Sequence, residues 1–164
     1  MATMEEYAKQ PIDQRLKRLE RTADDLAVTI KGQSGGALTQ RPDEKNWAGV
    51  EIICHLRDAE EMFDGRFQMF LAMEEGVKLL PVDVDRVAID RQYLRCDAGE
   101  SIEAFRKRRS ENLDRFRTLT PDQWKRGGTH PQRGKMTFED FVTLMAWHDD
   151  NHLDQLKRAL SGKP

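Results

Sequence analysis

Residues 146–156 read AWHDDNHLDQL and place His148 and His152 four positions apart within one helical pattern. Both histidines therefore lie on the same face of the predicted helix. That face is otherwise apolar, because the series 138, 141, 145, 148, 152 and 156 also contains Phe138, Phe141, Met145 and Leu156. A buried imidazole has two polar nitrogens to satisfy, so the pattern indicates either hydrogen-bond partners or a bound metal ion.

The same helical period recurs in three further segments of the chain. Apolar residues at three- and four-residue steps predict helices over residues 12–31, 47–75, 101–119 and 138–161. We predict that Asn46 caps the second helix. Thr120 and Thr137 each begin a pattern that resembles a capping box, the first opening a short turn and the second opening the fourth helix.

The connections between these helices show no convincing pair of strands. Residues 82–89 read VDVDRVAI and alternate like a strand, but a lone strand has no partner, so we predict an extended loop within residues 77–100. GGTHPQRGK, at residues 127–135, is predicted to be a second loop. The sequence therefore predicts an all-α four-helix bundle, formed as a single domain by residues 1–164.

The long connection between the second and third helices sets the expected topology. A short turn makes neighbouring helices antiparallel, whereas a connection of this length can cross the bundle and leave them parallel. We therefore expect an overhand bundle, with the helices running up, down, down and up.

The composition narrows the class of protein. The chain of 164 residues has 27 basic and 29 acidic side chains and a net charge of −2, which argues against a nucleic-acid partner. Its two cysteines form no disulfide framework. No apolar run approaches the roughly 18 residues of a membrane span, and the first residues lack the apolar core of a signal peptide. We expect a soluble, cytoplasmic protein that binds neither nucleic acid nor membrane.

A third histidine interrupts the apolar face of the second predicted helix. The series 48, 52, 55, 59 and 62 reads Ala48, Ile52, His55, Ala59 and Met62. At a rise of 1.5 Å per residue, His55 lies about 12 Å from the start of its helix, and His152 about 13–14 Å from the end of the fourth. If these helices run antiparallel, as the overhand topology requires, the three histidines share one layer near one end of the bundle.

Three neutral imidazoles in one layer suit zinc, nickel, copper or ferrous iron, and leave a coordination position open for water or substrate. Two alternatives stay open. Histidine pairs at this spacing occur by chance on many helices, and buried histidines can instead bond to carbonyl or carboxylate groups.

Three motifs together carry a family resemblance. VEIICHLRDAEEMF after Trp47, HPQRG before the fourth helix, and AWHDDNHLDQL resemble the DinB-like superfamily of damage-inducible proteins over about residues 47–160. The resemblance implies an overhand four-helix bundle, often dimeric, with a divalent metal ion held by His55, His148 and His152. Relatives of this family include transferases and isomerases that use bacillithiol or mycothiol, while many other members have no known reaction.

Two further residues are candidates for a catalytic or orienting role near the metal site. His130 in the HPQRG motif is a candidate catalytic group, although we favour a structural role in which it bonds to the backbone of its loop. Gln155, three residues beyond His152, is placed to hold that ring by a hydrogen bond, with exposure to solvent as the alternative.

Arg109 and Tyr93 are candidate substrate-binding residues. Arg109 falls on the apolar face of the third helix and could bind an anionic substrate. We favour instead a buried ion pair with Asp58 or Glu61 on the second helix. Tyr93 lies in the long connection and could reach the mouth of the metal site, with core packing as the alternative.

The leading hypothesis is a metal-dependent enzyme acting on a small molecule. A divalent ion, zinc or nickel in the first place and iron or manganese in the second, would activate a low-molecular-weight thiol for transfer to an electrophile, or water for hydrolysis. The competing hypothesis is a non-catalytic protein, either a metal-stabilised helical homodimer or a stress-responsive binding protein. The sequence assigns no general base, which keeps this alternative open.

Overall fold

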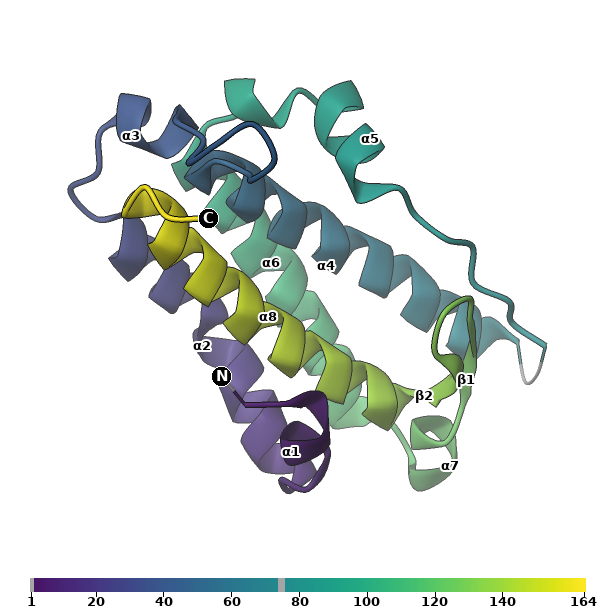
Figure 1. The fold of residues 1–164 in the computed structure, drawn as a ribbon. Helices are drawn as coiled ribbons and strands as arrows, with labels where there is room; N and C mark the ends of the chain where they lie inside the picture. The colour runs from purple at the N-terminus through teal and green to yellow at the C-terminus, as the bar shows by residue number, and fades with distance from the viewer. Residues whose placement is uncertain (1, 74–75) are drawn as a thin grey trace.

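A computed structural model describes residues 2–73 and 76–164 of the protein. Four long helices form a bundle (Figure 1): α2 (Ile12–Ile30), α4 (Gly49–Ala72), α6 (Ala98–Thr118) and α8 (Phe138–Leu160). The shorter elements are α1 (Met4–Ala8), α3 (Gly35–Thr39), α5 (Val84–Asp90), the 3-10 helix η1 (Tyr93–Arg95), α7 (Pro121–Trp124), β1 (Gly127–His130) and β2 (Gly134–Thr137). The predicted four-helix bundle is therefore confirmed.

The helices follow the predicted overhand topology. Cys54 near the start of α4 lies 3.5 Å from Ser101 near the start of α6, measured from Sγ to Oγ. Toward the other ends of these two helices, the rings of Phe67 and Phe116 are 5.1 Å apart. Consecutive helices α4 and α6 are thus parallel, while α2 and α8 run the opposite way (Figure 1).

The connection between α4 and α6, which we call the strap (residues 77–97), differs from the predicted extended loop. It contains α5 and η1, because the Asp83 side chain accepts a hydrogen bond from the backbone N–H of Arg86 and caps a helical turn. The alternation of VDVDRVAI therefore did not indicate extended backbone. None of the described helices is long and apolar enough to cross a membrane.

The second predicted loop is also wrong, because β1 and β2 pair as an antiparallel hairpin. The glycines of this segment gave no sequence signal for a strand, because glycine has a low β-propensity. Gly127 is required there by space: a Cβ atom at this position would lie 1.8 Å from the carbonyl oxygen of Met136. The hairpin also contacts the strap through a parallel bridge between Lys78 and Thr129.

Helix ends were predicted with mixed success. The capping boxes opened by Thr120 and Thr137 are present. Asn46 does not cap α4: Ala48 occupies the cap position, and its N–H donates to Glu51 at 2.9 Å. The Asn46 amide instead bonds to Asp43. α4 ends at Ala72, and the predicted end at residue 75 lies outside the described residues.

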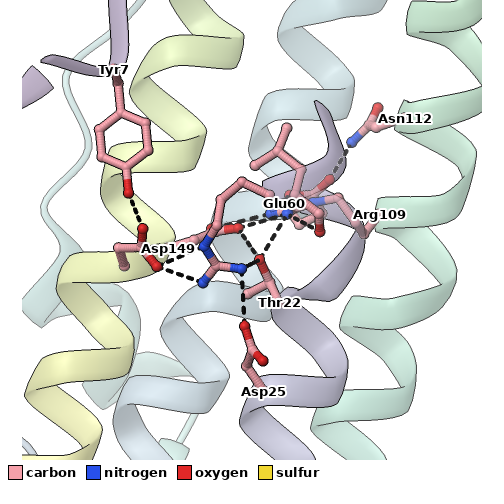
Figure 2. A network of polar contacts seen from close by, with 10 residues as sticks. Tyr7, Thr22, Asp25, Glu60, Arg109, Asn112 and Asp149 are labelled. Carbon is pink, nitrogen blue, oxygen red and sulfur yellow. Dashed lines mark hydrogen bonds and ion pairs between the residues drawn. The ribbon is translucent and has the colours of Figure 1, made fainter. Parts of the chain in front are cut away.

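A polar network lies at the centre of the bundle, between two clusters of apolar side chains. Arg109 of α6 is 3% exposed and bonds to Glu60 of α4 at 2.8 Å and to Asp149 of α8 at 2.6 Å. Its guanidinium also donates to the carbonyl oxygen of Leu19 in α2 at 3.0 Å. Thr22 of α2 completes the link by donating to Asp149 (Figure 2). One side chain therefore joins all four long helices.

The buried ion pair of Arg109 was expected, but with the wrong partners. Asp58 and Glu61 both face the strap, where they pair with Arg91 at 3.1 and 3.0 Å. Glu60 lies on the side of α4 that faces α6. Residues adjacent in a helix differ by about 100° in direction, so the choice of partner depends on a helix rotation that the sequence pattern left undetermined.

We expect Arg109→Ala to lower the free energy of unfolding by about 3–5 kcal/mol, because it leaves two buried carboxylates without their counter-charge. Chemical denaturation measures this change. Arg106→Ala is the matched control on the same helix: Arg106 pairs with Asp24 and Glu103 at the surface, so its loss should change stability by less than about 1 kcal/mol. Equal effects in the two variants would contradict the structural role of the network.

Candidate metal centre

The structure brings His55, His148 and His152 together between α4 and α8. The Nε2 atoms of His55 and His148 lie 3.1 Å apart. One ring nitrogen from each of the three residues can be chosen so that all three lie within 4.8 Å of one another. The predicted juxtaposition of imidazoles from two helices is therefore present.

The antiparallel packing of α4 against α8 produces this meeting. Gly49 at the start of α4 faces the end of α8, where a Cβ atom on Gly49 would lie 3.2 Å from Leu156. At the other end of α4, the Phe70 ring lies 5.5 Å from that of Phe138 at the start of α8. His55 follows Gly49 by six residues and His152 precedes Leu156 by four, so the two histidines lie at similar heights.

The three imidazoles are held in their neutral form. The pKa of His55 is lowered to about 3, mainly by burial and partly by the neighbouring His152. Burial is also the main cause that lowers the pKa of His148 and of His152. Neutral imidazole offers a nitrogen lone pair, which is the form that coordinates a metal ion.

Gln155 orients one of the rings. Its Oε1 lies 2.7 Å from Nδ1 of His152. Because an amide oxygen only accepts hydrogen bonds, Nδ1 of His152 carries the proton and Nε2 carries the lone pair. This is the arrangement predicted for Gln155, and its effect on metal binding stays a prediction.

The histidines open onto a cavity of about 350 Å³. Its walls are largely apolar and include Trp47, Phe63, Leu144 and Trp147. An adjoining hollow of about 270 Å³ under the strap shares His55 with it. The two hollows together give a small molecule access to one side of the histidine cluster.

His130 lines the larger cavity together with the three histidines. Its Nδ1 accepts a hydrogen bond from the backbone N–H of Gln132 at 3.2 Å, which is the structural contact that we favoured. Burial lowers the pKa of His130, and the positive charges of Arg66 and Arg133 add to the effect. Its place at the cavity leaves the catalytic role as a prediction.

Tyr93 lines the adjoining hollow, yet it is 1% exposed and its hydroxyl donates to Asp58 at 2.6 Å. Its packing role is therefore evident, and contact with a substrate stays a prediction. Arg109 lines neither hollow, since its guanidinium is occupied by the central network. The structure thus places Arg109 away from the position that substrate binding requires.

Sequence reasoning missed Arg66, which also lines the larger cavity. A signal was available, because Arg66 follows His55 by eleven residues, or three helical turns, and so lies on nearly the same face of α4.

The chain belongs to the DinB superfamily, whose family model matches residues 18–156. Among curated proteins it is 24% identical over 150 residues to "Putative metal-dependent hydrolase YfiT" of Bacillus subtilis (strain 168), covering 91% of this chain and 84% of that protein. It is 22% identical over 157 residues to "Putative metal-dependent hydrolase OB0413" of Oceanobacillus iheyensis, covering 96% and 90%.

A solved structure shares the fold. It is described as "YfiT from Bacillus subtilis is a probable metal-dependent hydrolase with an unusual four-helix bundle topology". The TM-score is 0.85 at 23% identity, with 93% of this chain and 87% of that chain covered. The overhand connection of the four helices is therefore shared with a relative of known structure.

The donor set of this chain fits a divalent ion. Ligands at about 2.0–2.1 Å from a tetrahedral zinc ion stand about 3.3 Å apart, and two of the imidazole nitrogens are already separated by 3.1 Å. Without an ion, the facing Nε2 atoms of His55 and His148 must share a proton. Three neutral nitrogen donors with no carboxylate among them suit zinc, nickel or iron better than magnesium or calcium.

We expect Gln155→Leu to release His152 from a single tautomer. In the unaltered protein, long-range ¹H–¹⁵N correlations of the imidazole should show His152 protonated at Nδ1 alone, because Gln155 accepts that proton. The variant should show a mixture of tautomers. Asp154→Asn is the control, since Asp154 bonds to Arg158. An unchanged His152 tautomer in Gln155→Leu would contradict the orienting role.

Proposed function

We propose that this protein is a metal-dependent enzyme that transfers a small thiol to an electrophile, with one divalent ion held by His55, His148 and His152. One observation carries the proposal: three neutral imidazole nitrogens converge at the wall of an apolar cavity and leave one side accessible. A purely structural metal site is usually closed by a fourth protein ligand, whereas a catalytic site keeps a position open.

The chemistry of the donor set supports activation of a thiol or of water. A divalent ion held by three neutral imidazoles keeps its full positive charge, which lowers the pKa of a coordinated thiol or water. Zinc and nickel are the metals that we propose first, and iron and manganese second.

The surrounding side chains exclude water and limit the ways in which protons can move. Trp47, Phe63 and Trp147 give the cavity apolar walls, which strengthen electrostatic interactions inside it. His130 accepts a backbone N–H at Nδ1, so in the neutral form its proton is on Nε2. That geometry supports His130 as a hydrogen-bond donor to a substrate rather than as a general base.

Hydrolysis is the second candidate, and the names of the two curated relatives favour it. Hydrolysis by an activated water commonly needs a nearby base. The larger cavity has no Asp or Glu among its described lining residues, and Asp58 and Glu61 in the adjoining hollow are paired with Arg91. This is why we place thiol transfer first.

We expect one equivalent of metal in protein purified without an affinity tag, measured by elemental analysis. His148→Ala should lose most of it, because two imidazoles bind far more weakly than three. Gln155→Leu should weaken affinity by about 10–100-fold, the usual effect of removing a group that orients a ligand. His130→Ala, at the same cavity, is the control and should retain the metal.

A second measurement distinguishes loss of the metal ligand in His148→Ala from misfolding of that variant. Metal in excess should raise the melting temperature of the unaltered protein, since it binds the folded state alone, and should not raise that of His148→Ala. Equal metal content in the two proteins would exclude the proposed ligand set.

We expect the metal-loaded protein to accelerate the reaction of small thiols with monochlorobimane, followed by fluorescence. Acceleration should disappear with chelation and in His148→Ala. Cleavage of an activated ester without thiol consumption would instead support hydrolysis. If metal binds and stabilises the protein but neither reaction is accelerated, the non-catalytic homodimer or binding protein becomes the better hypothesis.

A further inference from the structure

Arg66 of α4 is a buried arginine that has no counter-charge among the described residues. It is 8% exposed, and burial lowers the pKa of its guanidinium. Across residues 2–73 and 76–164, its side chain makes no hydrogen bond and no ion pair, and burial is the sole cause of its lowered pKa. A largely buried cation that lines a cavity is stabilised by an anion or by water that enters the cavity.

The other buried arginines of the bundle are compensated. Arg109 binds Glu60 and Asp149. Arg15, which is 3% exposed, donates to Thr143 and pairs with Glu139 at 2.6 Å. Arg66 is therefore an exception among them, and its surroundings suggest the reason.

Arg66 lines the same cavity as the three histidines. The other cationic or titratable side chains along that cavity are Arg133 and His130, and none of its described lining residues is acidic. Side chains on a helix lean toward its N-terminus, which directs Arg66 back along α4 toward His55. The cavity thus has imidazole nitrogens that could bind a metal at one end and, toward the other, a guanidinium with no counter-charge among the described residues.

We propose that Arg66 binds an anionic group, a carboxylate or a phosphate, on the thiol or electrophile that this protein uses. The inference rests on the proposed function and names the substrate class for the same site. A guanidinium binds such groups through two parallel N–H···O bonds. The ligand therefore supplies the negative charge that no described residue places beside Arg66.

The separation of His55 and Arg66 along α4 indicates the length and polarity of the ligand. Eleven residues separate His55 from Arg66, which is about 16 Å along the helix axis at 1.5 Å per residue. Between them Ala59, Met62 and Phe63 line the cavity. An extended molecule fits this arrangement if it has a metal-reactive group at one end, an apolar middle and an anionic group at the other end.

The first test needs no metal. NMR titrations of the metal-free protein with hexanoate, butyl phosphate and hexanamide should show binding of an anion but not of the neutral amide. Arg66→Met should weaken anion binding at least tenfold, while Arg106→Met, with the same change of charge on α6, should leave it unchanged. The anion that binds more tightly identifies the group. Equal affinities for hexanoate, butyl phosphate and hexanamide would overturn the proposal.

The stability of the variant adds an independent readout. Because Arg66→Met removes a buried charge that has no partner among the described residues and keeps a side chain of similar length, its melting temperature should equal or exceed that of the unaltered protein. A clear decrease would mean that Arg66 is structural, and would overturn the proposal.

The second test asks whether one ligand binds the metal and Arg66 at the same time. Protein loaded with cobalt(II) should bind 6-mercaptohexanoate at least tenfold more tightly than 6-mercaptohexan-1-ol, followed by the absorption of the cobalt–thiolate bond, and Arg66→Met should abolish the preference. If cobalt and both thiols bind equally well, the anion site is wrong while the metal centre stands. If no cobalt binds but the metal-free protein selects anions through Arg66, the metal centre is wrong while the anion site stands.

Discussion

The guanidinium of Arg109 is the point on which the bundle depends. It lies where α2, α4, α6 and α8 meet, and it bonds to a group on each of the other three. Because Asp149 must point at Arg109, the rotation of α8 about its own axis is fixed. His148 and His152 flank Asp149 within one turn, so the same rotation directs both toward α4. A structural ion pair thus positions the groups that we propose to bind metal.

Apolar periodicity was sufficient to predict the four long helices, their overhand connection and the face on which His55, His148 and His152 lie. These features depend on repeating patterns and on the length of one connection, which are both readable in the sequence. The helices of the strap and the strands of the hairpin were not predicted, because each depends on a local contact. The side-chain cap of Asp83 overrode an alternating pattern, and Gly127 is required by the closeness of another strand.

Partner choice was the least predictable property of individual side chains. Arg109 was expected to be inward and paired, and it is, but Glu60 and Asp149 replaced Asp58 and Glu61. A shift of one residue on a helix turns a side chain by about 100°, which exceeds the precision of an apolar stripe. Arg66 differs from Arg109: its place on the His55 face of α4 was readable from the helical spacing, whereas its lack of a partner among the described residues was not, because a pattern of residues contains no information on contacts.

The strap and the hairpin touch each other at the bridge between Lys78 and Thr129. Both contribute to the cavity: Val82 and Val84 come from the strap, and His130 comes from the hairpin. His55, His148, His152 and Arg66, in contrast, lie on the long helices α4 and α8. Mutations in the two connections can therefore reshape the cavity while the bundle keeps the histidine cluster and Arg66 in place, so this architecture can change which molecules fit the cavity during evolution without rebuilding its interior.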